Sequence, residues 1–327
     1  MDAISRVRTQ GMTRTSAAMD SPAEAPQGGE SRISLWKRAS FECTHAAVSI
    51  LLYGLSLKGL YRFGQLFGTV EWLINYKRRR RFHAALTRVC SDKPTGAQRR
   101  RETREFFRRN RCDRLFYLIL DQIPRAKAET LFSISNEALL DQAVQRGRGV
   151  YVALSHHGPH HVAAMLMSLR GHKVAGVRDR REGGIRRYVQ ARFDRLYPEF
   201  GRMRVLFSDS YPRDIYRCFR EGFVLGSAMD VSRLRRSNQK AEEVTIFGEK
   251  RHFLSGPLRV AVRCGAPVLQ AFITPGDAFT YRLEIVESLI DPDTVDDEDA
   301  AVARAMQTYA ANVERNLRAA PALMTRL

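Results

Sequence analysis

The sequence predicts an α/β protein with a mixed, largely parallel central sheet that is flanked by helices and preceded by an N-terminal membrane-associating helical segment. From Ser133 onward, short apolar runs with strand character alternate with segments of helix length, and such alternation is typical of a parallel-rich sheet covered by helices. Before Ser133, two apolar stretches interrupted by charges and an arginine-rich stretch have helical character.

Three parts of the chain differ in composition. Residues 1–32 are rich in Ser, Thr, Ala, Gly and Pro and lack the compact apolar run of a secretory signal, so we expect a flexible tail. Residues 33–130 are expected to form a helical, membrane-associating and basic region, and residues 131–327 the α/β domain. With 44% hydrophobic and 27% charged residues, the chain has the composition of an ordinary folded protein.

The apolar stretches of the N-terminal region are Ala46–Leu57 and Phe63–Ile74. Lys58, Arg62 and Glu71 interrupt them, so no clean run approaches the roughly 20 residues that a spanning helix needs. Lys58 and Arg62 are four residues apart and share one helix face. The pattern favours a monotopic or shallowly inserted helix, and a buried helix of a soluble protein is the alternative.

The charge balance indicates partners that carry negative charge. Lys and Arg outnumber Asp and Glu by 54 to 35, and the basic clusters 77–81 and 99–114 lie next to the apolar stretches. This arrangement favours an anionic membrane surface over nucleic acid, for which no RRM or zinc-finger pattern is present; a solvated helix face is the remaining alternative. The five cysteines are scattered, odd in number and without a C-x-x-C pair, which favours a reducing, cytoplasmic setting over a disulfide framework.

The first strand that the sequence pattern predicts is Gly149–Leu154. Before it, Asn136 can cap a helix that runs through Gln145 and stops at Gly147. After it, a helix from about His161 to Arg170 ends at Gly171.

The same alternation continues to the end of the chain. Strands are predicted at 173–177, 204–207, 223–229, 267–273 and 281–286, with a strand pair at 244–253 that turns at Gly248. Helices are predicted near 185–196, 214–220 and 257–264, and a final helix begins at Thr294–Asp297 and runs to about Arg318.

The segment after strand 149–154 holds four of the chain's eight histidines, at positions 156, 157, 160 and 161. The unperturbed pKa of histidine, about 6.5, lets it take and return a proton near neutral pH, and open α/β sheets place ligands at the ends of their strands. Histidine pairs four residues apart on one helix would suit zinc, but Gly158 and Pro159 make a continuous helix improbable there. We expect proton-transfer chemistry and no metal.

A series of landmarks follows in order: the His156-x-Gly158 loop, the strand end Val177-Arg178, Arg220-Glu221-Gly222 before a strand that leads to Asp230, Phe247-Gly248, Gly256-Pro257, and Gly265-Ala266-Pro267-Val268. In this order and spacing the chain resembles the lysophospholipid acyltransferase superfamily, in its lipid A biosynthesis lauroyl/myristoyl acyltransferase branch. The resemblance covers about residues 40–318.

The resemblance implies an O-acyltransferase domain in residues 131–327. Such an enzyme moves a fatty acyl chain from acyl carrier protein or acyl-CoA to a hydroxyl of a phosphorylated lipid acceptor, either a lipid A precursor or a lysophospholipid-like molecule. It needs no cofactor and works on the cytoplasmic face of the cell inner membrane, as a peripheral or monotopic protein. We expect no nucleic-acid partner.

Family members carry a His-x4-Asp/Glu motif, which aligns His156 with the catalytic base and His161 with the acid. His161 cannot supply a negative charge to stabilise a protonated imidazole, although a neutral imidazole could accept the Nδ1 proton of His156. Either another carboxylate, Asp230 or Asp179, replaces the acid, or the chain is a catalytically weak or silent relative that binds lipid. His157 and His160 are expected to fill the places of aromatic residues.

The resemblance also implies residues for substrate binding. Arg178, at a strand end, stands where the family has an arginine for acceptor phosphate, a task that suits a guanidinium. Arg192 extends the basic surface, and Ser255 opens the small-residue turn into a helix. The basic segment Ser232–Lys240 is a candidate surface for an acidic acyl carrier protein or a phosphorylated head group.

Overall fold

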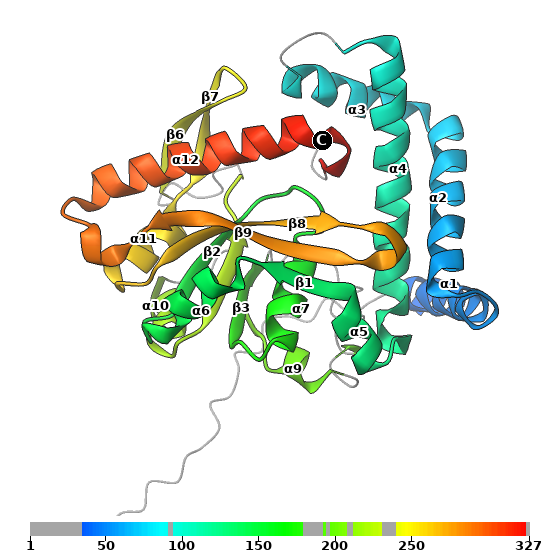
Figure 1. Cartoon of the computed structure of the whole chain (residues 1–327). Coiled ribbons are helices and arrows are strands. Elements are labelled where there is room, and N and C mark those ends of the chain that lie inside the picture. Colours follow the sequence, from blue (N-terminus) through cyan, green and yellow to red (C-terminus); the bar gives the residue numbers. More distant parts are fainter. Residues whose placement is uncertain are drawn as a thin grey trace, which may run out of the picture. The chain divides into compact units, whose positions relative to one another are not determined.

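The computed structural model describes residues 35–90, 94–178, 192–193, 197–207, 212–230 and 240–324 (Figure 1). The expected flexible tail 1–32 and most of the helix predicted near 185–196 lie outside these residues. The described residues belong to one contact unit, Ile33–Leu327.

A seven-stranded sheet forms the centre, in the order β1-β9-β8-β2-β5-β3-β4. Strands β8, β2, β5, β3 and β4 are parallel, β9 is antiparallel to β8, and β1 is parallel to β9. The prediction of a mixed, largely parallel sheet is therefore confirmed. The strands are β1 Phe132–Ser135, β2 Val150–Leu154, β3 Val174–Arg178, β4 Arg204–Phe207, β5 Val224–Ala228, β8 Val268–Pro275 and β9 Tyr281–Ile290.

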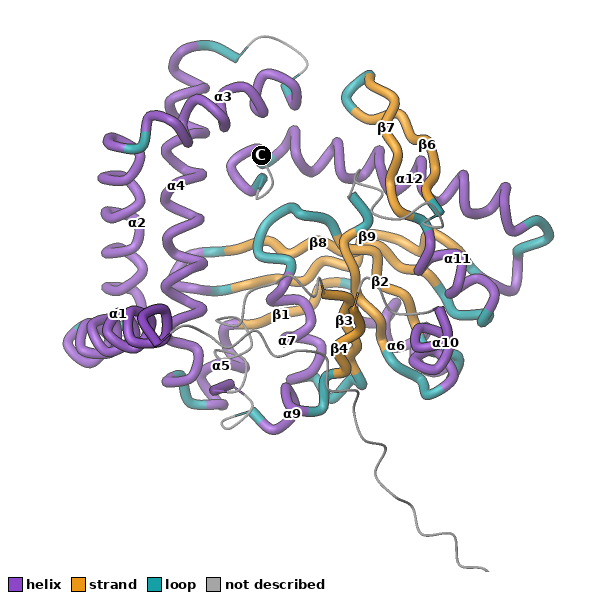
Figure 2. Tube along the Cα trace, turned by 180° about the vertical axis from the view of Figure 1, so that it is seen from behind, coloured by secondary structure: helices purple, strands orange, loops and turns teal. Residues whose placement is uncertain are grey.

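Helices cover both faces of the sheet because side chains of the central strand alternate between two cores. Val150, Val152 and Leu154 of β2 pack with α1, α2, α4–α7 and α9. Tyr151 and Ala153 pack with α10–α12 and a hairpin of β6 and β7. Figure 2 shows α7 and α12 on opposite sides of β8 and β9.

The bounds on the first side are α1 Leu35–Gly54, α2 Leu57–Ile74, α4 Gly96–Ile119, α5 Arg125–Leu131, α6 Glu137–Gln145, α7 His161–Leu169 and α9 Pro198–Gly201. On the second side they are α10 Pro212–Arg220, β6 Ala241–Ile246, β7 Glu249–Leu254, α11 Gly256–Arg263 and α12 Glu298–Ala319.

The N-terminal helices form a tightly packed group. Helix α2 lies against α4 at two glycines: a Cβ atom on Gly68 would lie 2.6 Å from the Cα atom of Arg108, so the two backbones are in contact there. Glu71, on the same face of α2, accepts hydrogen bonds from Arg78 of α3 (Tyr76–Val89) at 3.1 Å and from Arg111 of α4 at 2.5 Å. Among the described residues, none of the helices combines the length and the apolar character needed to span a membrane.

Three local features differ from the sequence prediction. Strand β1 was not predicted, and it is the short edge strand beside β9. Asn136 stands at the N-cap position of α6, as predicted, but its side chain makes no capping hydrogen bond and donates to the carbonyl of Ile285 instead. The final helix begins at Glu298 rather than at Thr294, since Asp297 caps its first turn and Thr294 ends a separate 3₁₀ turn.

Candidate active site

His156 and Asp230 lie at the same edge of the sheet. They follow the carboxyl ends of β2 and β5, which are parallel neighbours in a register that pairs Leu154 with Ala228. Each residue comes two positions after this pair, so the register places the two side chains level with each other. Ligands of open α/β sheets bind at this edge.

The two side chains are in direct contact. Nδ1 of His156 lies 2.7 Å from Oδ1 of Asp230, and the backbone N–H of His156 donates to Oδ2 at 2.8 Å. A carboxylate at Nδ1 favours the tautomer in which Nδ1 carries the proton and Nε2 the lone pair. The side chains are 22% and 17% exposed, so the pair is partly sheltered and still open to a substrate.

The loop after His156 is fixed from two sides. Gly158 has φ +65°, and a Cβ atom there would lie 2.5 Å from the carbonyl oxygen of Ile273 in β8. On its other side, the N–H of Gly158 donates to the carbonyl of Leu323 at 2.7 Å, and His157 forms an antiparallel bridge with Met324. The glycine is required because the loop backbone runs against the end of β8.

The neighbouring histidines have different surroundings. His157 is 3% exposed and packs edge-on against the ring of Phe272 at 5.8 Å. Burial lowers the pKa of His157 to about 4, so this ring is neutral at pH 7. The ring centroid of His160 lies 4.9 Å from that of His156.

His161 is the first residue of α7, and its ring meets Tyr117 of α4 at 5.2 Å. The carboxylate that contacts Nδ1 of His156 comes from Asp230, 74 residues along the chain, and not from the position that the alignment of motifs gave to the acid. A catalytic role for His161 stays a prediction, and Asp179, the other candidate carboxylate, lies outside the described residues.

The predicted binding residues are placed as follows. Arg178 is the last residue of β3, so its backbone lies at the same sheet edge as the pair; its side chain is outside the description. Arg192 donates to Asp121 and to Glu42, both at 2.9 Å, and thus connects two structural elements of the N-terminal region. Its contribution to a substrate surface stays a prediction.

Ser255 is fully buried before α11. Its hydroxyl donates to Glu242 at 3.2 Å, and Glu242 also accepts from Arg259 at 2.7 Å. The hydroxyl is therefore engaged within the fold, and substrate binding by Ser255 stays a prediction. Of the basic segment 232–240, only Lys240 is described.

Sequence reasoning missed Tyr117 and Tyr309, two aromatic residues near the site. Tyr117 contacts the rings of His161 and Phe193 at 5.2 and 5.1 Å. The apolar run at the end of the arginine-rich stretch predicts that this end of the helix is buried, but it does not identify the residues that Tyr117 contacts. Tyr309 reaches the carbonyl of Leu154, a contact across 155 residues that no local pattern contains.

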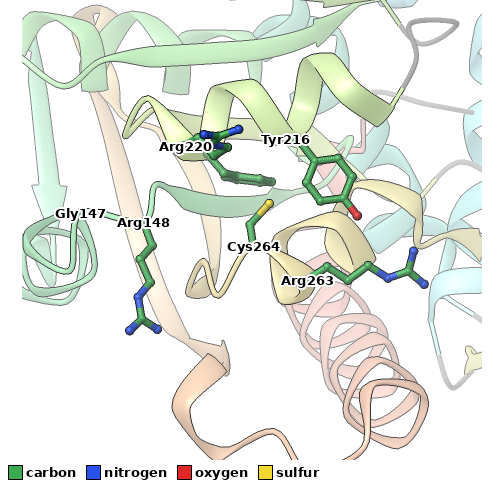
Figure 3. A pocket seen from close by; sticks show the side chains of 7 residues that line it. Gly147, Arg148, Tyr216, Arg220, Arg263 and Cys264 are labelled. Atoms are coloured by element: carbon green, nitrogen blue, oxygen red, sulfur yellow. The ribbon is translucent and has the colours of Figure 1, made fainter. Parts of the chain in front are cut away.

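A pocket of about 360 Å³ lies elsewhere, at the opposite edge of the sheet (Figure 3). Arg148, Arg220 and Arg263 approach it from three different elements around Cys264. Arg148 pairs with Asp293 and Arg263 with Glu298, each at 2.9 Å. Because Arg148 comes just before β2 begins, the pocket is separate from the His156–Asp230 pair.

A family model described as bacterial lipid A biosynthesis acyltransferase matches residues 42–324, which include both members of the pair. The chain belongs to this lipid A acyltransferase family. The resemblance seen in the sequence is thus confirmed, and family membership implies an acyltransferase with an acyl donor and a lipid acceptor. No curated protein matches the chain.

Proposed function

We propose that this lipid A acyltransferase family member transfers a fatty acyl chain from the thioester of acyl carrier protein or coenzyme A to a hydroxyl of a phosphorylated lipid acceptor, with His156 as the general base. The observation that carries this proposal is the 2.7 Å contact between Nδ1 of His156 and Oδ1 of Asp230. This contact supports the proposal because acyl transfer uses a histidine base whose imidazole is oriented by a carboxylate.

The reaction proceeds in two proton transfers at one nitrogen. Nε2 of His156 takes the proton of the acceptor hydroxyl while the oxygen attacks the thioester carbonyl carbon. The tetrahedral intermediate then collapses: the C–S bond breaks, and the imidazolium returns the proton to the departing thiolate. The products are an O-acyl ester and a free thiol, and Asp230 stabilises the imidazolium between the two steps.

The same contact argues against a silent, lipid-binding relative. That alternative was motivated by the histidine at position 161, where the family motif has an acid. Asp230, which follows the neighbouring strand β5, supplies a negative charge next to His156. The base therefore keeps a carboxylate partner although the motif has lost its acid.

The acceptor's phosphate is assigned to Arg178, because its strand ends at the same edge as the base. A phosphorylated acceptor and an acidic carrier also suit a chain with a net charge of +19. Within the family's range we propose a lipid A precursor as the acceptor class.

The N-terminal helices support attachment to a membrane surface. Helix α2 packs its glycine face against α4 and turns an apolar stripe outward, with the spacing of one helix face. The exposed side chains of the stripe are Phe63, Leu66, Phe67, Val70, Leu73 and Ile74. Helix α1 adds Leu35, Trp36, Ile50 and Tyr53. So many exposed large apolar side chains on two neighbouring helices are unusual on a protein that faces only water.

The partner that fits this surface is an anionic bilayer. Lys77, Arg80 and Arg81 of α3 are exposed directly after the stripe of α2. Each basic side chain near an anionic leaflet contributes about 1 kcal/mol to binding. We therefore place the enzyme at the cytoplasmic face of the inner membrane, where the apolar stripe enters the lipid and the cations meet head groups.

The experiment that tests the proposed function is transfer of labelled acyl chains from acyl carrier protein and from acyl-CoA to a panel of lipid A precursors and lysophospholipids in vesicles. Wild type is expected to form an alkali-labile ester, and His156→Ala to lose it. His172→Ala, which changes a histidine just beyond α7, is the matched control. Equal transfer by wild type and His156→Ala contradicts the assignment of the base, and no transfer by wild type supports the silent relative.

A further inference from the structure

The hydroxyl of Tyr309 reaches the end of the strand that carries His156. Tyr309 belongs to α12 and is fully buried. Its hydroxyl donates to the carbonyl of Leu154, the last residue of β2, at 2.7 Å. Leu154 is two residues before His156, so this bond fixes the backbone from which the base projects.

The same carbonyl holds the other member of the pair. Leu154 also accepts a hydrogen bond from the N–H of Met229 at 3.2 Å, and Met229 directly precedes Asp230. A single acceptor therefore joins α12, the end of β2 and the residue before the carboxylate. A shift of the Leu154 backbone therefore moves both His156 and Asp230.

Tyr309 is itself held in place by buried polar contacts. Its carbonyl accepts from Nε2 of Gln270 in β8 at 3.2 Å, and Oε1 of Gln270 accepts from Asn312 at 2.7 Å. Burial raises the pKa of Tyr309 well above its ordinary value, and the negative charge of Asp230 adds to this. The phenol therefore stays protonated and keeps its donor.

The chain that follows α12 continues toward the same loop, on the far side of His156. The carbonyl of Leu323 accepts from Gly158, and Met324 bridges His157. Residues from Tyr309 to Met324 thus contact the catalytic loop both before and after the base. In Figure 1, α12 runs along one side of β8 and β9, and its red end lies at the mark of the C-terminus.

We propose that Tyr309 is a positioning residue for the reaction: through the carbonyl of Leu154 it sets the distance and angle at which Asp230 meets His156. The inference rests on the proposed role of His156 as the base. Tyr309 acts on the pair through the backbone at Leu154, Met229 and Asp230, and not as a group that takes or returns the transferred proton.

The test compares Tyr309→Phe with Tyr151→Phe. Tyr151 is also fully buried and lies on the same side of the sheet, and its hydroxyl is hydrogen-bonded to Ser227 at 2.6 Å. The two variants therefore remove the same group from similar surroundings. Misplacement of a reacting group by about 1 Å lowers rates by up to about 100-fold. We expect Tyr309→Phe to lower kcat by about 10- to 100-fold with KM unchanged, and Tyr151→Phe to change neither by more than about twofold.

A second readout is independent of turnover. In protein with ¹⁵N-labelled histidine, the Nδ1 proton of His156 is expected as a downfield resonance that disappears in His156→Ala and in Asp230→Ala. Tyr309→Phe should shift or broaden it, whereas Tyr151→Phe should leave it. Because this signal needs no substrate, it tests Tyr309 even if wild type transfers no acyl chain and the proposed function fails.

Three outcomes overturn the inference. They are an unchanged kcat and an unchanged resonance in Tyr309→Phe, equal losses in Tyr309→Phe and Tyr151→Phe, or a Tyr309→Phe protein that does not fold. The last outcome would assign the hydroxyl to stability alone. A fall in kcat at constant KM together with a changed resonance, in a variant with a cooperative thermal transition, supports the positioning role.

Discussion

Asp230 contacts His156 through both carboxylate oxygens, Oδ1 at the ring Nδ1 and Oδ2 at the backbone N–H, at 2.7 and 2.8 Å. The second bond removes the rotational freedom of the carboxylate, because its plane is fixed by two donors from one residue. The orientation of the imidazole is therefore set by backbone as well as side chain.

Asp230→Asn is expected to lower kcat by about 10²- to 10⁴-fold. The amide can still meet the backbone N–H, but it carries no charge to stabilise the imidazolium. The measurement is kcat in the acyl-transfer assay under saturating donor and acceptor. A variant with near wild-type kcat would show that another group supplies the charge.

His161→Gln tests whether His161, at the acid position of the motif, has a catalytic role. Because Asp230 occupies Nδ1 of His156, we expect this substitution to lower kcat by less than Asp230→Asn does. Both variants are compared in one assay, with unfolding midpoints as the check on folding. The opposite ranking would restore His161 to the role that the motif assigns to its position.

Replacing Leu66 and Phe67 by Asp is expected to weaken vesicle binding by at least about tenfold, since burial of each large apolar side chain stabilises by about 1.5–3 kcal/mol. The assay is co-sedimentation with vesicles that contain anionic phospholipid. Leu139→Asp, at an exposed leucine of α6 outside the stripe, is the control. If the double variant binds as tightly as the control, the stripe is not the membrane surface.

Gly158→Ala is expected to destabilise the fold by more than about 1 kcal/mol, because φ is positive and the new Cβ meets the carbonyl of Ile273. Gly171→Ala separates the two effects: φ is +87° there, and nothing lies within 4 Å of the added Cβ. Urea unfolding of both variants measures the difference. Equal losses would mean that the loop can move away from β8.

Acidification should destabilise the protein through His157. Its pKa is about 4 when folded and 6.5 ordinarily, so between these values the unfolded chain binds more protons and stability falls as pH falls. The contribution lost between about pH 6.5 and pH 4 is about 3 kcal/mol. His157→Phe removes it, so its unfolding free energy should fall less than that of wild type over this window. Parallel pH dependences of the two proteins would contradict the burial of a neutral ring.

The sequence by itself determined the class of the fold and indicated His156 as the candidate base. Strand 149–154 is continuous and apolar because β2 is buried on both faces, and the histidines follow it directly, so both were visible locally. The order of landmarks, from the His156 loop to Val268, also sufficed to indicate the family, because order and spacing are properties of the chain.

The tertiary structure decided which carboxylate contacts His156, the candidate base. Local spacing pointed to His161, five positions away, with Asp230 as one of two substitutes. The parallel pairing of β2 with β5 brings Asp230 to His156 across 74 residues, and α12 brings Tyr309 to the same point across 155. A hydrogen bond depends on the distance between atoms, and strand register and helix packing set that distance, so no pattern along the chain contains it.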